Sequence, residues 1–333
     1  MMDKLPTDLT ATGPLAVATR SLVKNFGRKT ALAGVDLTVP GGAVYVLVGR
    51  NGVGKTTTIN VLMDLVVADA GTAEVLGLDT GGEGSRVRAQ VGYVPERHDV
   101  GYGWLRVGAL MRYHAAYYPE WDEAYAGELA RLFDVRMEAK FGKLSKGEKR
   151  RVQLLLALAH HPPVLLMDEP TDGLDPVMRD QALSALAGHL ARFPTTILVS
   201  THQVHEAERL ADHLGVMRAG RIEAQFSREA LRCYLREYRI EAPRGWAGVP
   251  EMADVVIRRN GSGREVAWAI WGDEGDVVAR LAQAGAEVRH VEPLKLEDAA
   301  VALLARDVTS DGPRGSDTPQ TAPAGVSPGR GEE

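Results

Sequence analysis

The spacing of hydrophobic residues changes along the chain, and each change predicts a different kind of element. Apolar and polar residues partly alternate over 15–23 and 31–39, and a turn at 25–28 separates them, which predicts antiparallel strands at a sheet edge. Residues 43–48 form an unbroken apolar run that leads through a glycine-rich loop into a helical pattern over 57–66. A buried strand followed by a loop and a helix is typical of a parallel α/β sheet.

Further buried strands and helices follow this unit. Residues 102–142 have helical spacing but no buried-strand run, so they predict a mostly helical insertion in the α/β core. We expect short apolar strands at 91–94, 164–167 and 196–199, and helices at 152–159, 178–192 and 204–214.

The character of the chain changes again after residue 228. A small α+β domain is predicted by strand patterns at 238–242, 255–259, 265–271 and near Val288, a turn pair at Asn260-Gly261, and helical patterns at 276–284 and 296–305. Residues 307–333 are rich in glycine and proline and contain no aromatic residue, which predicts a disordered tail.

These patterns suggest a division of the chain into four parts. We expect an N-terminal extension over 1–14, a main α/β domain over 15–228 with a helical subdomain at about 97–160, a C-terminal accessory α+β domain over 229–306, and the tail over 307–333.

Composition narrows the class of protein. The chain has 333 residues, of which 45% are hydrophobic and 25% charged, enough for about two domains. A formal net charge of -5 gives no overall attraction to nucleic acid, so no nucleic-acid partner is expected. The single cysteine, Cys233, excludes an internal disulfide and favours a reducing compartment. No apolar run approaches the roughly 20 residues that a membrane helix needs.

The loop after residues 43–48 carries a phosphate-binding pattern. Its glycines allow a tight turn in which backbone N–H groups and the helix N-terminus face an anion. Lys55 is expected to reach the β- and γ-phosphates, and Thr56 to offer its hydroxyl to Mg²⁺. Arg50, Asn51 and Thr57 are expected to make backbone or phosphate contacts. The motif, which matches G-x-x-x-x-G-K-[ST], is Gly49-Arg50-Asn51-Gly52-Val53-Gly54-Lys55-Thr56.

Two adjacent acids end the apolar strand at 164–167. Asp168 emerges at the carboxyl edge of the sheet, where open α/β sheets bind ligands. Because neighbouring strand residues point to opposite faces, Asp168 can hold Mg²⁺ while Glu169 orients and polarises a water for attack on the γ-phosphate. The alternative is a solvated strand exit that Pro170 terminates.

Together with these motifs, the segment Leu144-Ser145-Lys146-Gly147-Glu148 makes residues 15–227 resemble the ATP-binding subunit of an ABC transporter. The resemblance implies an α/β fold, a P-loop NTPase (ABC ATPase) core with an antiparallel β edge and a helical subdomain, and it implies ATP and Mg²⁺ as cofactors. In that family the signature loop caps the γ-phosphate on the opposite subunit, so Ser145 and Gly147 are expected to act across a head-to-tail dimer. Taken alone, the same residues predict a capping box between Ser145 and Glu148.

The resemblance also implies roles for residues outside these motifs. Phe26 holds the place of an aromatic that stacks on adenine, although an exposed turn phenylalanine is the alternative. Asp175 is expected to bridge the two subunits. His202 follows the strand at 196–199 as the family's switch histidine, which contacts the γ-phosphate. The implied catalytic set is Lys55, Glu169 and His202.

Three positions depart from the family pattern. Glu96 stands where the family usually has glutamine; it can still bind Mg²⁺ or orient water, but it adds a negative charge near the γ-phosphate. In the signature, Lys146 replaces a glycine and Glu148 replaces a glutamine. Lys146 can supply charge to the triphosphate or point to solvent. Since Lys55, Asp168, Glu169 and His202 remain, we expect an active ATPase.

Residues 294–304 resemble the closing helix of bacterial ABC-2-type ATPases of exporters. This favours an ATP-hydrolysing motor that drives export through a separate membrane permease, located peripherally at the cytoplasmic face and paired with a second ATPase subunit. The aromatic residues of the helical insertion provide a docking face or pack its own core. A soluble ABC-type ATPase that acts on ribosomes or DNA, and a regulatory subunit that never hydrolyses ATP, are the alternatives.

Overall fold

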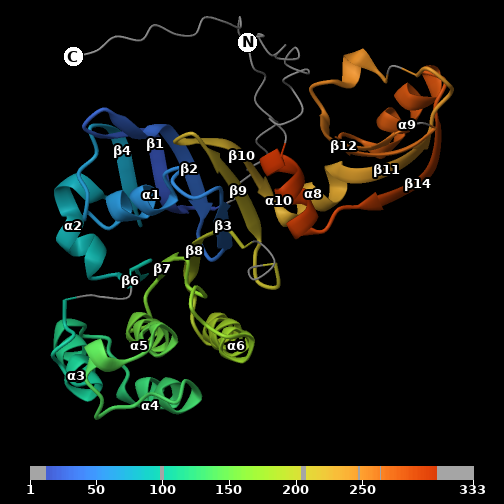
Figure 1. Cartoon of the computed structure of the whole chain (residues 1–333). Helices are drawn as coiled ribbons and strands as arrows, with labels where there is room; N and C mark the ends of the chain where they lie inside the picture. The colour runs from blue at the N-terminus through green and yellow to red at the C-terminus, as the bar shows by residue number, and fades with distance from the viewer. Residues whose placement is uncertain (1–12, 98–100, 204–207, 247, 263, 306–333) are drawn as a thin grey trace, which may run out of the picture.

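The computed structural model describes residues 13–97, 101–203, 208–246, 248–262 and 264–305. Its central sheet has the strand order β10-β9-β3-β8-β7-β6 (Figure 1). Only β10 pairs antiparallel in this sheet. Its strands are β3 (Val44–Val48), β6 (Val91–Val94), β7 (Val164–Asp168), β8 (Thr196–Thr201), β9 (His213–Arg218) and β10 (Arg221–Ser227). The predicted strands at 43–48, 91–94, 164–167 and 196–199 are therefore confirmed as the core of a parallel α/β sheet.

Helices cover both faces of this sheet. On one face, Ile59 of α1 (Lys55–Leu62) packs with Tyr45 and Leu47 of β3. On the other face, apolar side chains of α5 (Lys146–Leu158) and α6 (Pro176–Arg192) pack with Ile197 and Val199 of β8. Because side chains of a strand alternate between faces, the unbroken apolar runs of β3, β7 and β8 supply both layers at once.

A second, antiparallel sheet lies beside the phosphate loop. Its order is β2-β1-β4-β5, and α2 (Thr80–Arg88) follows it. The predicted hairpin is confirmed, with Phe26 opposite Lys29 at its turn. The sequence pattern does not predict β4, because only two of its six residues are buried. The strands are β1 (Leu15–Phe26), β2 (Lys29–Pro40), β4 (Ala70–Val75) and β5 (Leu78–Asp79).

Between β6 and β7 the described elements are helices, as the spacing predicts. They form the lower part of the molecule in Figure 1, where they pack beside α5 and α6. Phe133 and Phe141 are fully buried there and share a core with the apolar face of α5. The elements are α3 (Val107–Tyr117), α4 (Glu123–Leu132) and the short 3-10 helix η1 (Phe141–Lys143).

The C-terminal part contains a third sheet, of order β12-β13-β11-β14, whose strands pair antiparallel. Figure 1 shows α8 and α10 between this sheet and the central one. Leu303 of α10 belongs to the same hydrophobic cluster as Val46 and Val48 of β3. The C-terminal part therefore packs against the strand that leads into the phosphate loop. The elements are α8 (Arg228–Tyr234), β11 (Leu235–Glu241), η2 (Pro250–Met252), β12 (Val256–Ser262), β13 (Glu265–Trp271), α9 (Glu274–Gln283), β14 (Glu287–Pro293) and α10 (Leu296–Ala305).

Two local predictions are wrong. The described part of the expected helix at 204–214 is a turn that leads into β9, because the buried residues from Leu214 onward pair with β3 in the parallel sheet. The expected hairpin turn at Asn260-Gly261 lies inside β12, where Gly261 pairs with Val266, and the chain reverses between Ser262 and Glu265. In both places pairing with a neighbouring strand overrides the local signal.

Some predictions fall on residues that the structure does not describe. The N-terminal extension lies outside the described residues except for its last two positions, and the tail at 307–333 lies outside them entirely. Within the described part of the chain, every helix is too short or too polar to traverse a lipid bilayer.

Candidate functional site

The phosphate loop joins the fully buried strand β3 to α1 through a backbone that requires glycine. Gly54 has φ +117°, and a Cβ there would lie 2.7 Å from the carbonyl oxygen of Ala31. A Cβ on Gly49 would lie 2.6 Å from the carbonyl oxygen of Met217. Gly54 is the N-cap of α1 and has no side chain to offer, so the first N–H groups of the helix lack a side-chain cap and can bind an anion.

Lys55 lies across this loop with only 6% of its surface exposed. Its Nζ donates hydrogen bonds to the carbonyl oxygens of Gly49 at 2.8 Å and Arg50 at 3.4 Å. The same Nζ lies 3.8 Å from Oε1 of Glu169, so its charge is directed at the space between the loop and the end of β7. An ammonium held by carbonyls in this way is a preformed point charge for a phosphate group.

Asp168 ends β7 and is fully buried. The hydroxyl of Ser200 on β8 donates a hydrogen bond to Oδ1, whereas the buried Oδ2 has no hydrogen-bond partner among the described residues. Burial raises the pKa of Asp168; interactions with the Ser200 and Thr56 hydroxyls oppose this effect, and the nearby charges of Glu96 and Glu169 add to it. An orphaned buried carboxylate oxygen is costly unless a cation or a proton satisfies it.

Glu169 stands in a strained backbone position, with φ 49° in the left-handed region. Its N–H is bonded to the carbonyl oxygen of Ser200 at 2.9 Å. Its carboxylate is held from β8 and the residues after it: Oε2 accepts from Thr201 Oγ1 at 3.2 Å, and Oε1 lies 2.9 Å from Nδ1 of His202. The two acids therefore point to different partners, as their positions on the strand predict.

A cavity of about 370 Å³ opens over the phosphate loop. It brings together the hairpin of the second sheet, the loop, the start of α1 and the two acids at positions 96 and 169. Lys29 and Ala31 also line it, although the sequence motifs did not include them; their place just after the turn that carries Phe26 is the only signal that points to them. The lining residues are Phe26, Lys29, Ala31, Asn51, Gly52, Gly54, Lys55, Thr56, Thr57, Glu96 and Glu169.

Glu96, which replaces the usual glutamine, reaches this cavity from the end of β6. Its Oε2 accepts a hydrogen bond from the Thr56 hydroxyl at 3.3 Å. Phe26 also lines this cavity, with 51% of its surface exposed, and the Nζ of Lys24 lies 5.5 Å from its ring centre. The lining thus combines an aromatic ring with hydroxyl and carboxylate oxygens.

The signature loop lies apart from this cavity, since Ser145, Gly147, Asp175 and His202 are not among its lining residues. Ser145 and Glu148 form the predicted capping box: Ser145 Oγ accepts from the N–H of Glu148 at 3.2 Å, and Glu148 Oε2 accepts from the N–H of Ser145 at 2.7 Å. Asp175 caps α6 by accepting from the N–H of Met178 at 2.9 Å. These residues therefore begin two helices that flank one surface.

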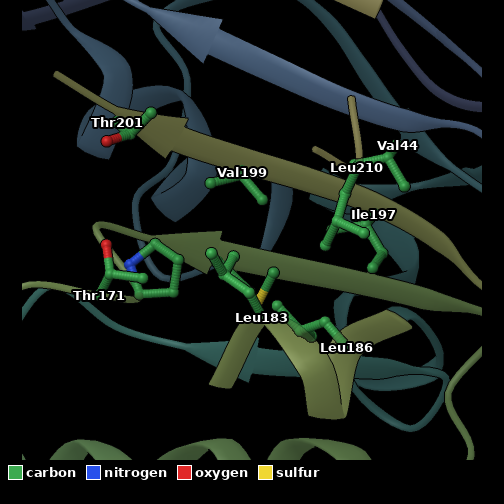
Figure 2. Close-up of a pocket in the computed structure, with 10 residues that line it drawn as sticks. Val44, Thr171, Leu183, Leu186, Ile197, Val199, Thr201 and Leu210 are labelled. Atoms are coloured by element: carbon green, nitrogen blue, oxygen red, sulfur yellow. The ribbon is translucent and has the colours of Figure 1, made fainter. Parts of the chain in front are cut away.

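A second hollow lies between the central sheet and α6, on the face that packs against α5 and α6 (Figure 2). Figure 2 shows Val44, Ile197 and Val199 from the sheet opposite Leu183 and Leu186 of α6. The only polar side chains in its lining are those of Thr171 and Thr201, so no charged side chain lines this hollow. It does not extend the site over the phosphate loop.

Comparison with known proteins agrees with this geometry. Residues 32–172 match the ABC transporter family. The Nod factor export ATP-binding protein I of Paraburkholderia xenovorans (strain LB400) is 35% identical over 296 residues, which cover 86% of this chain and 95% of that protein. The daunorubicin resistance ATP-binding protein DrrA2 of Streptomyces coeruleorubidus is 34% identical over 250 residues, or 73% of this chain and 77% of that protein.

A solved structure agrees as well. The ATP-binding subunit of an ABC transporter superimposes with a TM-score of 0.59 at 29% sequence identity, over 65% of this chain and 92% of that one.

Proposed function

The chain belongs to the ATP-binding proteins of ABC transporters, and on this premise we propose that it is the motor subunit that drives export through a separate membrane permease. It is an ATPase of the ABC type. The observation that carries the proposal is the pairing of Lys55, fixed over the phosphate loop, with Glu169, fixed by His202 at the edge of the same cavity. A phosphate-binding cation beside an oriented carboxylate is the arrangement that hydrolysis of a phosphoanhydride requires.

ATP fits the cavity in one direction. The open N-terminus of α1 and Lys55 would bind the β- and γ-phosphates, with Asn51 and Thr57 lining the same end. The exposed ring of Phe26 would stack on the adenine at the other end. Gly49 and Arg50 would hold Lys55 in place through their carbonyl oxygens, and the carbonyl oxygen of Val53 accepts from the N–H of Gly220 at 3.0 Å.

The residues beside the phosphate loop also fit Mg²⁺. The Thr56 hydroxyl, the orphaned Oδ2 of Asp168 and the carboxylate of Glu96 would hold it. No cluster of three or more histidine, cysteine or acidic side chains suited to a metal occurs among the described residues, which agrees with an ion that binds mainly phosphate and water oxygens. When bound, Mg²⁺ would neutralise charge that develops on the phosphate oxygens.

Glu169 is suited to act on the attacking water. It would accept the water proton while His202, which donates from Nδ1 to Oε1, keeps the carboxylate in place. The backbone N–H of His202 adds a hydrogen bond of 3.4 Å to Oε2. Because the carboxylate is held on both oxygens, it cannot turn away from the end of the phosphate loop without losing these bonds.

A second ATPase subunit would complete the site. Ser145, Gly147 and Asp175 lie outside the cavity of their own chain, so they would act on the nucleotide of a partner subunit in a head-to-tail dimer. The start of α5, with its capping box, would face the γ-phosphate of the partner. Closing of the dimer around ATP and its reopening after hydrolysis would then supply the mechanical step.

The helical insertion offers a docking face for the permease. Among its aromatic side chains, Tyr102 and Trp121 pack against the buried core, Tyr118 stacks on His160, and Trp104 and Tyr117 are 71% and 73% exposed. We therefore place the docking face on the exposed pair and the neighbouring Tyr113, because exposed aromatics are enriched in the cores of interfaces. We propose a peripheral position at the cytoplasmic face of the membrane, where such a docking face would meet the permease.

Export is favoured over import by the relatives. Two of them are named for export of Nod factor and for resistance to daunorubicin. The segment that resembles the closing helix of exporter ATPases forms α10, whose apolar side chains pack in one cluster with β3.

The proposal is tested with two variants and the wild type. In the presence of ATP and Mg²⁺, Glu169→Gln should form a stable dimer on size exclusion and lose hydrolysis by about 100-fold or more, since it keeps the shape but not the basicity of the carboxylate. Lys55→Ala should stay monomeric and inactive. Membranes that contain the tagged chain should yield a membrane-spanning partner. A monomeric Glu169→Gln with bound ATP would contradict the dimer, and wild-type levels of hydrolysis by Lys55→Ala would contradict the site.

A further inference from the structure

Two side chains of the signature helix hold the backbone that carries Glu96. Arg150 of α5 is fully buried, and its guanidinium donates to the carbonyl oxygens of Pro95 at 2.5 Å and Glu96 at 3.1 Å. One turn further, the buried Gln153 donates from Nε2 to the carbonyl oxygen of Arg97 at 3.1 Å. Three consecutive carbonyls directly after β6 are thus bonded to one helix.

The two side chains also support each other. Arg150 Nη1 donates to Oε1 of Gln153 at 3.2 Å, so the amide is oriented with its NH₂ group toward Arg97. This set of contacts, which we call the carbonyl clamp, consists of Arg150, Gln153 and the backbone of residues 95–97. A planar guanidinium is suited to hold two carbonyls in fixed directions, which an ammonium is not.

The charge of Arg150 is compensated from the nucleotide site. Burial lowers its pKa to about 10, so the side chain is still protonated at neutral pH. The carboxylates of Asp172, Asp168, Glu169 and Glu96 act in the opposite direction and stabilise the cation. The clamp therefore interacts electrostatically with Asp168, Glu169 and Glu96. Because its hydrogen bonds go to backbone carbonyls, they fix the path of the main chain.

We propose that Arg150 and Gln153 are positioning residues for Glu96: they fasten residues 95–97 to the signature helix, so that the Glu96 carboxylate faces Thr56 and moves together with α5. This inference rests on the proposed function, in which Glu96 takes part at the Mg²⁺ site. A change in the position of α5, which would accompany a change in the state of the dimer, would therefore reach the nucleotide site through these buried hydrogen bonds.

Arg150→Lys and Gln153→Met test the clamp, because the first keeps the charge and the second nearly keeps the volume. Arg151→Lys is the matched control: Arg151 neighbours Arg150 on α5 and also donates to a backbone carbonyl, that of Phe133 in the helical insertion. In the nucleotide-free full chain, hydrogen exchange of the amides of Tyr93 and Val94, which pair with β7 directly before the clamp, should accelerate about tenfold in both clamp variants and stay unchanged in Arg151→Lys.

Hydrolysis provides the second readout. Each clamp variant should lower kcat by about tenfold with little change in KM for ATP, the size of effect that loss of a supporting residue has at metal sites. In a Glu96→Ala background the same substitutions should cost almost nothing more, because their effect acts through Glu96. Should Arg150→Lys fail to fold, Gln153→Met carries the same comparison.

The inference would be overturned if the loss of kcat in a clamp variant adds fully to that of Glu96→Ala, or if amide exchange at Tyr93 and Val94 is unchanged. Wild-type chain and Glu169→Gln are measured in parallel. Suppose that the wild type hydrolyses ATP, that Glu169→Gln does not, and that the loss of kcat in the clamp variants adds to that of Glu96→Ala. Then the inference is wrong and the proposed function stands. If the wild type binds no ATP, the proposed function falls and the inference with it.

Discussion

The Nζ of Lys146 lies 2.8 Å from Oδ2 of Asp172, so the lysine that replaces a glycine in the signature loop is bonded to the turn that follows Glu169. The aliphatic part of Lys146 lies over Gly173, where a Cβ would come within 2.7 Å of it. The N–H of Asp172 in turn donates to the carbonyl oxygen of Glu169 at 3.1 Å. Of the two expectations for Lys146, charge for a triphosphate or a solvent-exposed side chain, neither describes this intramolecular ion pair.

Removal of this ion pair should have a small, salt-dependent effect on stability. The side chains of Lys146 and Asp172 are 50% and 40% exposed, and exposed pairs contribute up to about 1 kcal/mol. We expect Lys146→Ala and Asp172→Ala to show a coupling energy within this range in a double-mutant cycle measured by urea denaturation. The coupling should fade in about 1 M salt, where charges are screened over roughly 3 Å. A coupling that salt does not change would mean that packing on Gly173, rather than charge, joins the two loops.

Gly54→Ala should weaken ATP binding while the fold survives. Its φ of +117° and the 2.7 Å approach of a Cβ to the Ala31 carbonyl oxygen force the phosphate loop to shift. Strain of about 1–3 kcal/mol in the loop should weaken ATP binding about tenfold or more, as measured by fluorescence titration. Gly188→Ala is the control, since Gly188 lies in α6 with no atom near its Cβ position. Equal ATP affinity in the two variants would contradict the assignment of a rigid loop.

Leu303→Ala should destabilise the ATPase core although the residue lies close to the end of the described chain. Leu303 is 2% exposed and packs in one cluster with Val46 and Val48 of β3. Loss of a buried leucine side chain costs about 2–5 kcal/mol, which chemical denaturation should detect. Val301→Ala, on the same helix at a position that is 50% exposed, should cost less than about 0.5 kcal/mol. Similar costs for the two variants would show that α10 does not share this core in solution.

Acid should weaken the fold through His189. Its Nδ1 lies 3.1 Å from the Tyr125 hydroxyl and its Nε2 3.0 Å from Thr195 Oγ1, which itself donates to the Pro162 carbonyl oxygen. The ring is therefore neutral, with the proton on Nε2, and burial lowers its pKa from 6.5 to about 4. Below pH 6.5 the unfolded chain binds the proton more readily, so the unfolding free energy should fall by on the order of 2 kcal/mol as pH drops from 6.5 to 4.

His189→Gln provides the check on this pH dependence. The amide can replace both hydrogen bonds but does not titrate, so urea denaturation between pH 4 and 7 should show a flatter profile for this variant. The contribution of the buried His160, whose pKa burial also lowers to about 4, would remain. An unchanged profile in His189→Gln would rule out His189 as the source.

The sequence determined those features that depend on local order. Residues that follow each other in β3, the loop and α1 must meet, because the strand, the glycines and the helix N-terminus are contiguous, and the same holds for the acid pair that ends β7. The capping box of Ser145 and Glu148 is likewise a matter of four neighbouring residues. For these positions spacing alone predicts which atoms face each other.

Tertiary structure decided the contacts between residues that are far apart in the sequence. Lys29 lines the cavity, Lys146 forms an ion pair with Asp172, and Arg150 donates a hydrogen bond to the carbonyl oxygen of Glu96. These contacts exist only because sheet pairing and helix packing bring the segments together. The same reason explains why the helix predicted at 204–214 does not include its last two residues, which belong to β9 and pair with β3. Local propensity differs by only about 1 kcal/mol per residue between alternatives, so burial in a shared core decides between them.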